Sequence, residues 1–121
     1  MAASDTENLI QKKCAPCEGG LPALSRARAE ALLRALKSWK LSPDARLISV
    51  DYEMKNFKTA VELVDRIAAL AESENHHPDL HLTGYRKLRV ELSTHAIGGL
   101  SENDFIVAAK IDRLPKEIRA K

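Results

Sequence analysis

Three of the four histidines of this chain lie within six positions, and the fourth stands alone. His76, His77 and His81 surround Pro78, whereas His95 precedes a pair of glycines. An imidazole has an ordinary pKa near neutral pH, so it can both give and accept protons under working conditions. Two such groups on opposite sides of a ligand could eliminate water from a carbinolamine. One would protonate the departing hydroxyl and the other would remove a proton from nitrogen, without a metal or a redox cofactor.

The alternation of apolar residues indicates where the later histidines point. Leu88, Val90 and Leu92 form the core-facing set of one strand pattern, so His95 falls in the opposite set at the strand end. By the same alternation His81 points outward with Asp79 and Thr83. We therefore expect His95 to face away from the core, and His81 to be a solvated strand residue.

Two carboxylates stand at positions that could support these histidines. Glu72 precedes His76 by four residues and shares a face with it if the preceding helix persists that far. Asp104 is the third helical residue of a capping box that Ser101 opens, a structural role of its own. A carboxylate there could also orient an imidazole or accept hydrogen bonds from a ligand's amino group.

A metal site is the main alternative, because imidazole is a common zinc ligand. Adjacent residues such as His76 and His77 tend to diverge, however, and no His-x-x-x-His pattern is present. The pair Cys14 and Cys17 has no second pair to complete a four-ligand zinc site. Glycines follow this pair where a redox motif would have a helix, so a reduced segment without a metal or redox role is favoured. We therefore predict a site without metal or cofactor.

The elements that position these residues follow from the hydrophobic pattern. Ser25 is a plausible N-cap for a first helix, whose apolar stripe is Ala29, Leu32, Leu33 and Leu36. Trp39 is expected to cap the core, and strands over residues 39–41 and 47–52 form a hairpin. Asn56 opens the clearest helix, which Pro78 is expected to end. Its predicted stripe is Phe57, Ala60, Val61, Val64, Ile67, Ala68 and Ala71.

Two further half-buried strands precede a last helix. They cover residues 80–82 and 88–92, and the helix runs from Ser101 toward Pro115. The order α-β-β-α-β-β-α predicts an α+β two-layer sandwich, a four-stranded antiparallel sheet with three helices on one face. We assign residues 1–24 to a polar N-terminal extension and residues 25–121 to a single domain.

Composition excludes several classes of partner. The net charge is +2 with acids and bases interspersed, and aromatic residues make up 4% of the chain, so nucleic acid is not expected. No apolar run approaches the roughly 20 residues of a membrane span, and no membrane partner is expected. The acidic N-terminus lacks the features of a secretion signal, which favours a cytoplasmic location.

Three motifs together resemble a known family, the pterin-4a-carbinolamine dehydratases. They are Glu72-x-x-x-His76-His77-Pro78-Asp79, the strand end Leu92-Ser93-Thr94-His95, and Gly99-Leu100-Ser101-x-x-Asp104. Lys55-Asn56-Phe57 also resembles the segment that begins the family's central helix. The resemblance covers residues 25 to about 112, and the combination is far more specific than a lone His-His-Pro.

The resemblance implies a small-molecule substrate, 4a-hydroxytetrahydrobiopterin or a related 4a-hydroxytetrahydropterin. The product would be the quinonoid dihydropterin, in recycling of the cofactor of aromatic amino-acid hydroxylases. By position, His76, His77 and His95 would be catalytic, with His76 and His95 in proton transfer and His77 mainly in binding. Glu72, Thr94 and Asp104 would bind substrate. The family also implies a homodimer or homotetramer.

Two points qualify this function. Animal members are similar to dimerisation cofactors of a homeodomain transcription factor, so a protein-binding module is the alternative. Animal members also often have an aromatic pair after the His-His-Pro-acidic motif, where this chain has Leu80-His81. That difference changes the wall of the expected site or its neighbourhood.

Overall fold

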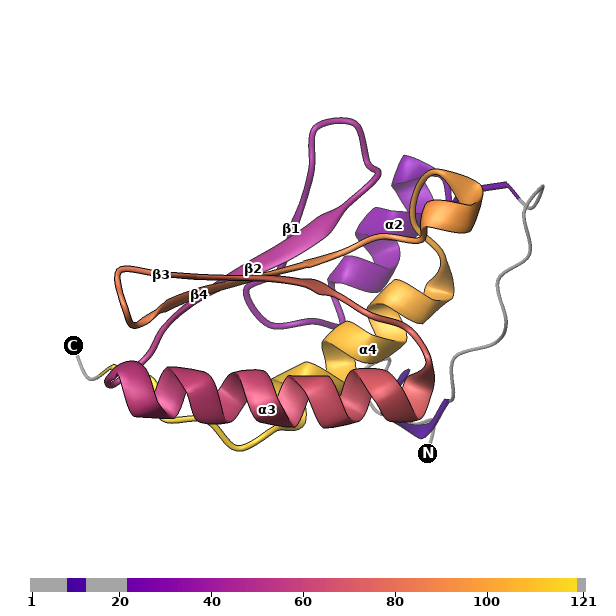
Figure 1. Cartoon of the computed structure of the whole chain (residues 1–121). Coiled ribbons are helices and arrows are strands. Elements are labelled where there is room, and N and C mark those ends of the chain that lie inside the picture. The colour runs from indigo at the N-terminus through magenta and orange to yellow at the C-terminus, as the bar shows by residue number, and fades with distance from the viewer. Residues whose placement is uncertain (1–8, 13–21, 120–121) are drawn as a thin grey trace, which may run out of the picture.

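The computed structural model describes residues 9–12 and 22–119, and its elements confirm the predicted order. A sheet forms one layer, and the helices form the other (Figure 1). One short 3-10 helix, η1, was not predicted. The elements are α2 (Arg26–Leu33), β1 (Lys40–Leu41), β2 (Ile48–Glu53), α3 (Phe57–Glu74), β3 (Asp79–Thr83), β4 (Lys87–Leu92), η1 (His95–Ile97) and α4 (Glu102–Arg113).

The four strands are antiparallel in the order β1-β2-β4-β3, which confirms the predicted α+β sandwich. β2 and β4 pair along their full lengths, with Val50 opposite Val90. Alternate residues of these strands face the helices and are buried. They are Ile48, Val50, Leu88, Val90 and Leu92. The strand alternation in the sequence therefore identified the core face correctly.

Side-chain caps fix where the helices begin. The Ser25 hydroxyl accepts a hydrogen bond from the backbone N–H of Arg28. Asn56 and Thr59 cap each other's backbone N–H groups at the start of α3, and Ser101 and Asp104 form the capping box predicted for α4. Such caps are each worth about 1 kcal/mol. They confirm the predicted helix starts.

The end of α3 differs from the prediction. The helix stops at Glu74, because Asn75 adopts the left-handed conformation with φ of 53°. The backbone N–H of His76 then bonds to the carbonyl oxygen of Ala71, which closes the helix before Pro78 can act. Asparagine tolerates this conformation better than most residues. The helix does not persist to His76, so the condition under which Glu72 would share a helical face with His76 is not met.

The buried face of α3 is also rotated from the predicted stripe. Ala60, Leu63, Ile67 and Ala71 are buried, whereas Phe57 is 55% exposed and Val61 is 37% exposed. Two overlapping apolar stripes run along this helix, and the sequence pattern alone does not distinguish them. Only one of them can face the sheet.

Trp39 is buried in the core as expected, and its indole N–H donates to a carboxylate oxygen of Asp112. Leu9, which lies within the predicted N-terminal extension, is also buried against the core. In the described part of the chain, no helix combines the length and hydrophobicity needed to cross a bilayer.

Candidate active site

The centre of the site is a short contact between His76 and Asp104. The Nε2 atom of His76 lies 2.6 Å from Oδ1 of Asp104. Asp104 is fully buried, and the His76 side chain is only 11% exposed. The left-handed turn at Asn75 directs His76 toward α4, and the capping box fixes Asp104 at the start of that helix. A pair 28 residues apart in sequence is thereby held in one geometry.

Other donors occupy the second oxygen of Asp104. Its Oδ2 atom accepts from the Thr94 hydroxyl at 2.8 Å and from the Ser101 backbone N–H at 3.0 Å. The Ser101 hydroxyl lies 2.8 Å from the Thr94 hydroxyl. An ionised carboxylate can only accept hydrogen bonds. In the contact between His76 and Asp104, the proton is therefore carried by Nε2 of His76. Nδ1 is then the His76 nitrogen that can exchange a proton with a ligand.

His77 makes a separate contact with Glu72. Its Nε2 atom lies 2.6 Å from Oε2 of Glu72, and both side chains are well exposed. The predicted carboxylate partner for a histidine at the helix exit therefore exists, but it serves His77 rather than His76. The two adjacent histidines have different environments, one buried against α4 and the other at the surface.

His95 begins η1, three residues after the last residue of β4, and is exposed. It therefore faces away from the core, as predicted, although it lies in a helical turn beyond the strand. Gly98 closes this turn in the left-handed conformation, with φ of 66°. His95 and the turn between β1 and β2 line a cavity of about 390 Å³. The other lining residues are Ser42, Asp44, Arg46, Leu47, Ser93, Thr94, Gly98 and Gly99.

His81 lies outside this group, on the exposed face of the sheet. Its Nε2 atom is 2.9 Å from Oε1 of Glu91, which also accepts a hydrogen bond from Arg89. Arg89, followed by His81, lowers the pKa of the Glu91 carboxyl. His81 therefore belongs to a surface charge network, which agrees with its predicted place on the solvated face.

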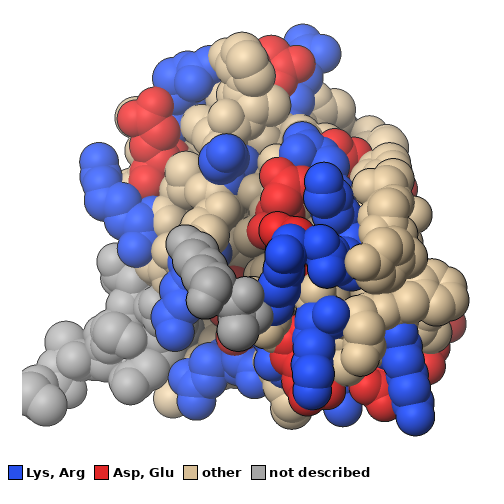
Figure 2. Space-filling model, turned by 90° about the vertical axis from the view of Figure 1, so that its left-hand side faces the viewer, with Lys and Arg blue, Asp and Glu red and all other residues tan. Residues whose placement is uncertain are grey.

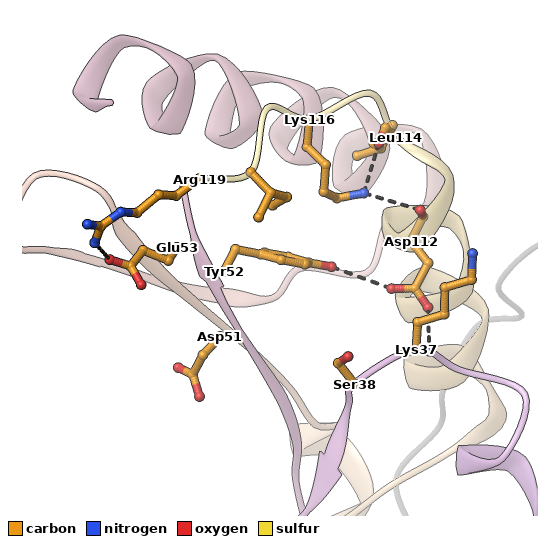
Figure 3. Close-up of a pocket in the computed structure, with 10 residues that line it drawn as sticks. Lys37, Ser38, Asp51, Tyr52, Glu53, Asp112, Leu114, Lys116 and Arg119 are labelled. Carbon is orange, nitrogen blue, oxygen red and sulfur yellow. Dashed lines mark hydrogen bonds and ion pairs between the residues drawn. The ribbon is translucent and has the colours of Figure 1, made fainter. Parts of the chain in front are cut away.

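A larger cavity lies elsewhere, between β2, the end of α4 and the segment that follows α4 (Figure 3). It measures about 860 Å³, and its polar groups largely satisfy one another. Asp112 accepts hydrogen bonds from the Lys37 backbone, Trp39 and Tyr52, while Lys116 donates to three backbone carbonyls. Burial, with Asp112 beside it, raises the pKa of the Tyr52 phenol. This cavity is larger than the one beside His95 but contains none of the predicted site residues, so cavity volume alone does not identify the candidate active site.

Sequence reasoning missed one buried ion pair next to His76. Nζ of Lys110 on α4 lies 2.7 Å from Oε2 of Glu74, the last residue of α3. The side chains are 17% and 4% exposed, respectively. The sequence could have indicated the burial of Glu74, though not its partner, because Glu74 continues the spacing of the buried residues Leu63, Ile67 and Ala71.

Within residues 9–12 and 22–119, no three His, Cys, Asp or Glu side chains form a group that could hold a metal ion. Cys14 and Cys17 lie outside the described residues.

On the face shown in Figure 2, Lys and Arg lie among Asp and Glu, without a uniform field of one sign. This face matches the interspersed charges of the sequence.

Comparison with known proteins assigns the family. The family model for pterin 4 alpha carbinolamine dehydratase matches residues 22–114. This chain belongs to that family. Among its dehydratase relatives, a provisionally named pterin-4-alpha-carbinolamine dehydratase of Halorhodospira halophila is 45% identical over 107 residues, covering 88% of this chain and 97% of the relative. Pterin-4-alpha-carbinolamine dehydratase 2, mitochondrial, of Arabidopsis thaliana is 43% identical, covering 91% of this chain and 60% of the relative.

Solved structures agree with the dehydratase fold. The transcriptional coactivator/pterin dehydratase from Brucella melitensis superposes with a TM-score of 0.70 at 30% identity, covering 75% of this chain and 96% of that one. A pterin dehydratase-like protein described as a RuBisCO assembly factor in the alpha-carboxysome superposes with a TM-score of 0.54 at 19% identity, covering 64% of this chain and 88% of that one. The second likeness concerns the fold alone. Proteins with this fold are thus described by roles other than dehydration.

Proposed function

We propose that this chain is a hydro-lyase that dehydrates a 4a-hydroxytetrahydropterin, such as 4a-hydroxytetrahydrobiopterin, to the quinonoid dihydropterin. The observation that carries the proposal is the His76–Asp104 pair, whose 2.6 Å contact is held by a fully buried carboxylate. His77 directly follows His76, and His95 directly follows Thr94, whose hydroxyl donates to Asp104. Family membership supports the substrate class.

The reaction needs two proton transfers of opposite direction. An imidazolium gives a proton to the hydroxyl on C4a, and the carbon–oxygen bond breaks to release water. A neutral imidazole removes the proton from the neighbouring ring nitrogen, whose electron pair then forms the double bond to C4a. Substrate becomes product plus one water, with no oxidant, reductant or metal. General acid–base catalysis of this kind contributes about 10²- to 10⁴-fold.

We assign the two proton transfers to His76 and His95, and substrate binding mainly to His77 with Glu72. Asp104 and Thr94 act through His76 in this scheme, because the Thr94 hydroxyl and both Asp104 oxygens already have partners within the protein. They are positioning residues that fix the tautomer and orientation of the imidazole. The pathway we propose is recycling of the pterin cofactor of aromatic amino-acid hydroxylases.

A dehydration assay with a histidine variant tests the proposal. We expect wild-type protein to accelerate loss of water from 4a-hydroxytetrahydrobiopterin, and excess chelator to leave the rate unchanged. His95→Ala should keep the fold, since the side chain is exposed, and should lower kcat at least 100-fold. Unchanged turnover in this variant would remove His95 from the mechanism.

We also propose that the chain self-associates, as a homodimer or homotetramer. Phe57 and Val61 lie one helical turn apart on α3, and both side chains are substantially exposed. Large apolar residues that are neighbours on a helix surface often mark a contact with another chain. Sedimentation of wild-type protein and a Val61→Glu variant tests this point, and a monomeric wild type would refute it.

A further inference from the structure

The cavity beside His95 has a second wall that no catalytic motif includes. The sheet order places the β1–β2 turn at the same end as the end of β4, since Ile48 of β2 pairs with Leu92 of β4. Ser42, Asp44 and Arg46 from this turn line the cavity together with His95. A ligand that touches His95 inside this cavity therefore meets the turn as well.

Hydrogen bonds within the turn hold its backbone in one conformation. The Ser42 hydroxyl accepts from the backbone N–H groups of Arg46 at 3.2 Å and Leu47 at 3.1 Å, and it lies 2.7 Å from Oδ1 of Asp44. The Arg46 N–H also reaches Oδ1 of Asp44 at 3.2 Å. The guanidinium of Arg26, at the start of α2, donates to the carbonyl oxygen of Pro43. The turn is therefore fixed before any ligand arrives.

Two residues of the turn that line the cavity carry opposite charges, Arg46 and Asp44. Within the described residues, the exposed Arg46 guanidinium forms no hydrogen bond or ion pair. The hydrogen bond from Ser42 is the largest of the effects that lower the pKa of Asp44, so this carboxyl is ionised at neutral pH. The two opposite charges balance, and a ligand group with a net charge of either sign would meet one like charge. A neutral group that both donates and accepts hydrogen bonds suits both side chains.

We propose that Arg46 and Asp44 select pterins with a hydroxylated substituent on the ring over pterins with an alkyl substituent. A vicinal diol accepts from the guanidinium with one oxygen and donates to the carboxylate with the other. This inference rests on the proposed dehydratase function, with the reacting ring beside His95 and its substituent directed toward the turn. It assigns specificity to residues outside the three family motifs.

The experiment compares two substrates in the full-length protein. One is the 4a-hydroxy form of tetrahydrobiopterin, which has a dihydroxypropyl group, and the other is the 4a-hydroxy form of 6-methyltetrahydropterin. Arg46→Gln should lower kcat/KM for the dihydroxypropyl substrate about five- to tenfold, because exposed hydrogen bonds to a charged group are modest. It should change kcat/KM for the methyl substrate less than twofold. Asp44→Asn should show the same selectivity. Arg34→Gln changes an exposed arginine outside the cavity, at the C-cap that follows α2, and should affect neither substrate.

The outcomes separate this inference from the proposed function. Equal effects of Arg46→Gln on both substrates, or no effect on either, would refute the selectivity while leaving the dehydratase function intact. If wild-type protein turns over neither substrate, the dehydratase proposal fails and the inference fails with it. Fluorescence titration with biopterin and 6-methylpterin gives a readout apart from turnover. Arg46→Gln should weaken only biopterin binding, and unchanged affinity for biopterin would count against the inference.

Discussion

Replacement of Asp104 by Asn is the perturbation whose result follows most closely from the geometry. The amide keeps the shape of the carboxylate but has one acceptor and one donor end. Thr94 and the Ser101 N–H both require an acceptor at the second oxygen position, so the amide oxygen should take that position. The amide nitrogen then faces Nε2 of His76 and forces the proton of the neutral ring onto Nδ1. The nitrogen available to the ligand can no longer accept a proton.

The size of each effect can be estimated. Loss of a correctly oriented acid–base group should lower kcat at least 100-fold. The three hydrogen bonds to a charged group in the wild type become neutral or unfavourable, at about 1 kcal/mol each. The neutral amide costs less to bury than the carboxylate, which offsets part of this loss. We expect a net destabilisation of about 2 kcal/mol, or a Tm lower by about 5–10 °C.

Asp112→Asn is a matched control, because Asp112 also lies on α4 and accepts three hydrogen bonds. It should lower stability to a similar degree without a comparable loss of kcat. The assay is steady-state dehydration at a temperature well below both Tm values, with stability measured separately by urea unfolding. If Asp104→Asn retained kcat within twofold of wild type, or if both variants lost kcat equally, the role given to the His76–Asp104 pair would be refuted.

Three further predictions concern stability. Lys110→Met should cost about 1–3 kcal/mol, because it removes the ammonium group from a largely buried ion pair with Glu74. Urea unfolding would show this, and no measurable loss of stability would contradict it. Asn75→Gly should retain stability within about 1 kcal/mol, whereas Asn75→Val should lose about 1–2 kcal/mol in the left-handed conformation, as thermal melts would report. Arg89 and then His81 lower the pKa of Glu91 in the folded protein. The ionised Glu91 carboxyl therefore stabilises the fold above the ordinary carboxyl pKa of about 4.3, and this stabilisation is lost as the pH falls through the lower pKa of the folded state. The stability difference between wild type and Glu91→Gln should therefore be larger at pH 7 than at pH 3, and an equal difference at both would count against the network.

Local signals in the sequence predicted most of the fold. Ser25, Asn56 and Ser101 begin their helices because each offers a side-chain oxygen to free backbone N–H groups, an interaction contained within four residues. Strand alternation identified the buried residues of β4, because a strand with one covered face has a period of two. Both kinds of evidence are complete within a short stretch of chain.

The parts that failed depend on one local turn and on contacts between distant segments. The left-handed turn at Asn75 ends α3 before Pro78, and the docking of α3 on α4 brings His76 to Asp104 instead of Glu72. Spacing along one helix offered Glu72 as the partner of His76, and the sequence named Asp104 as a carboxylate that could orient an imidazole without identifying which one. The same docking buries Glu74 against Lys110, a pairing that the sequence gives no means of matching.

The measurement that tests the central claim most directly is the rate of quinonoid dihydropterin formation from 4a-hydroxytetrahydrobiopterin, with wild-type protein and with His76→Ala. The account predicts that wild-type protein accelerates this step well above the rate in buffer, and that His76→Ala loses at least about 100-fold in kcat while still folded. Two results would contradict the claim that His76, held by Asp104, takes part in the dehydration. One is a wild-type rate no higher than the rate in buffer, and the other is a kcat of His76→Ala equal to that of wild type.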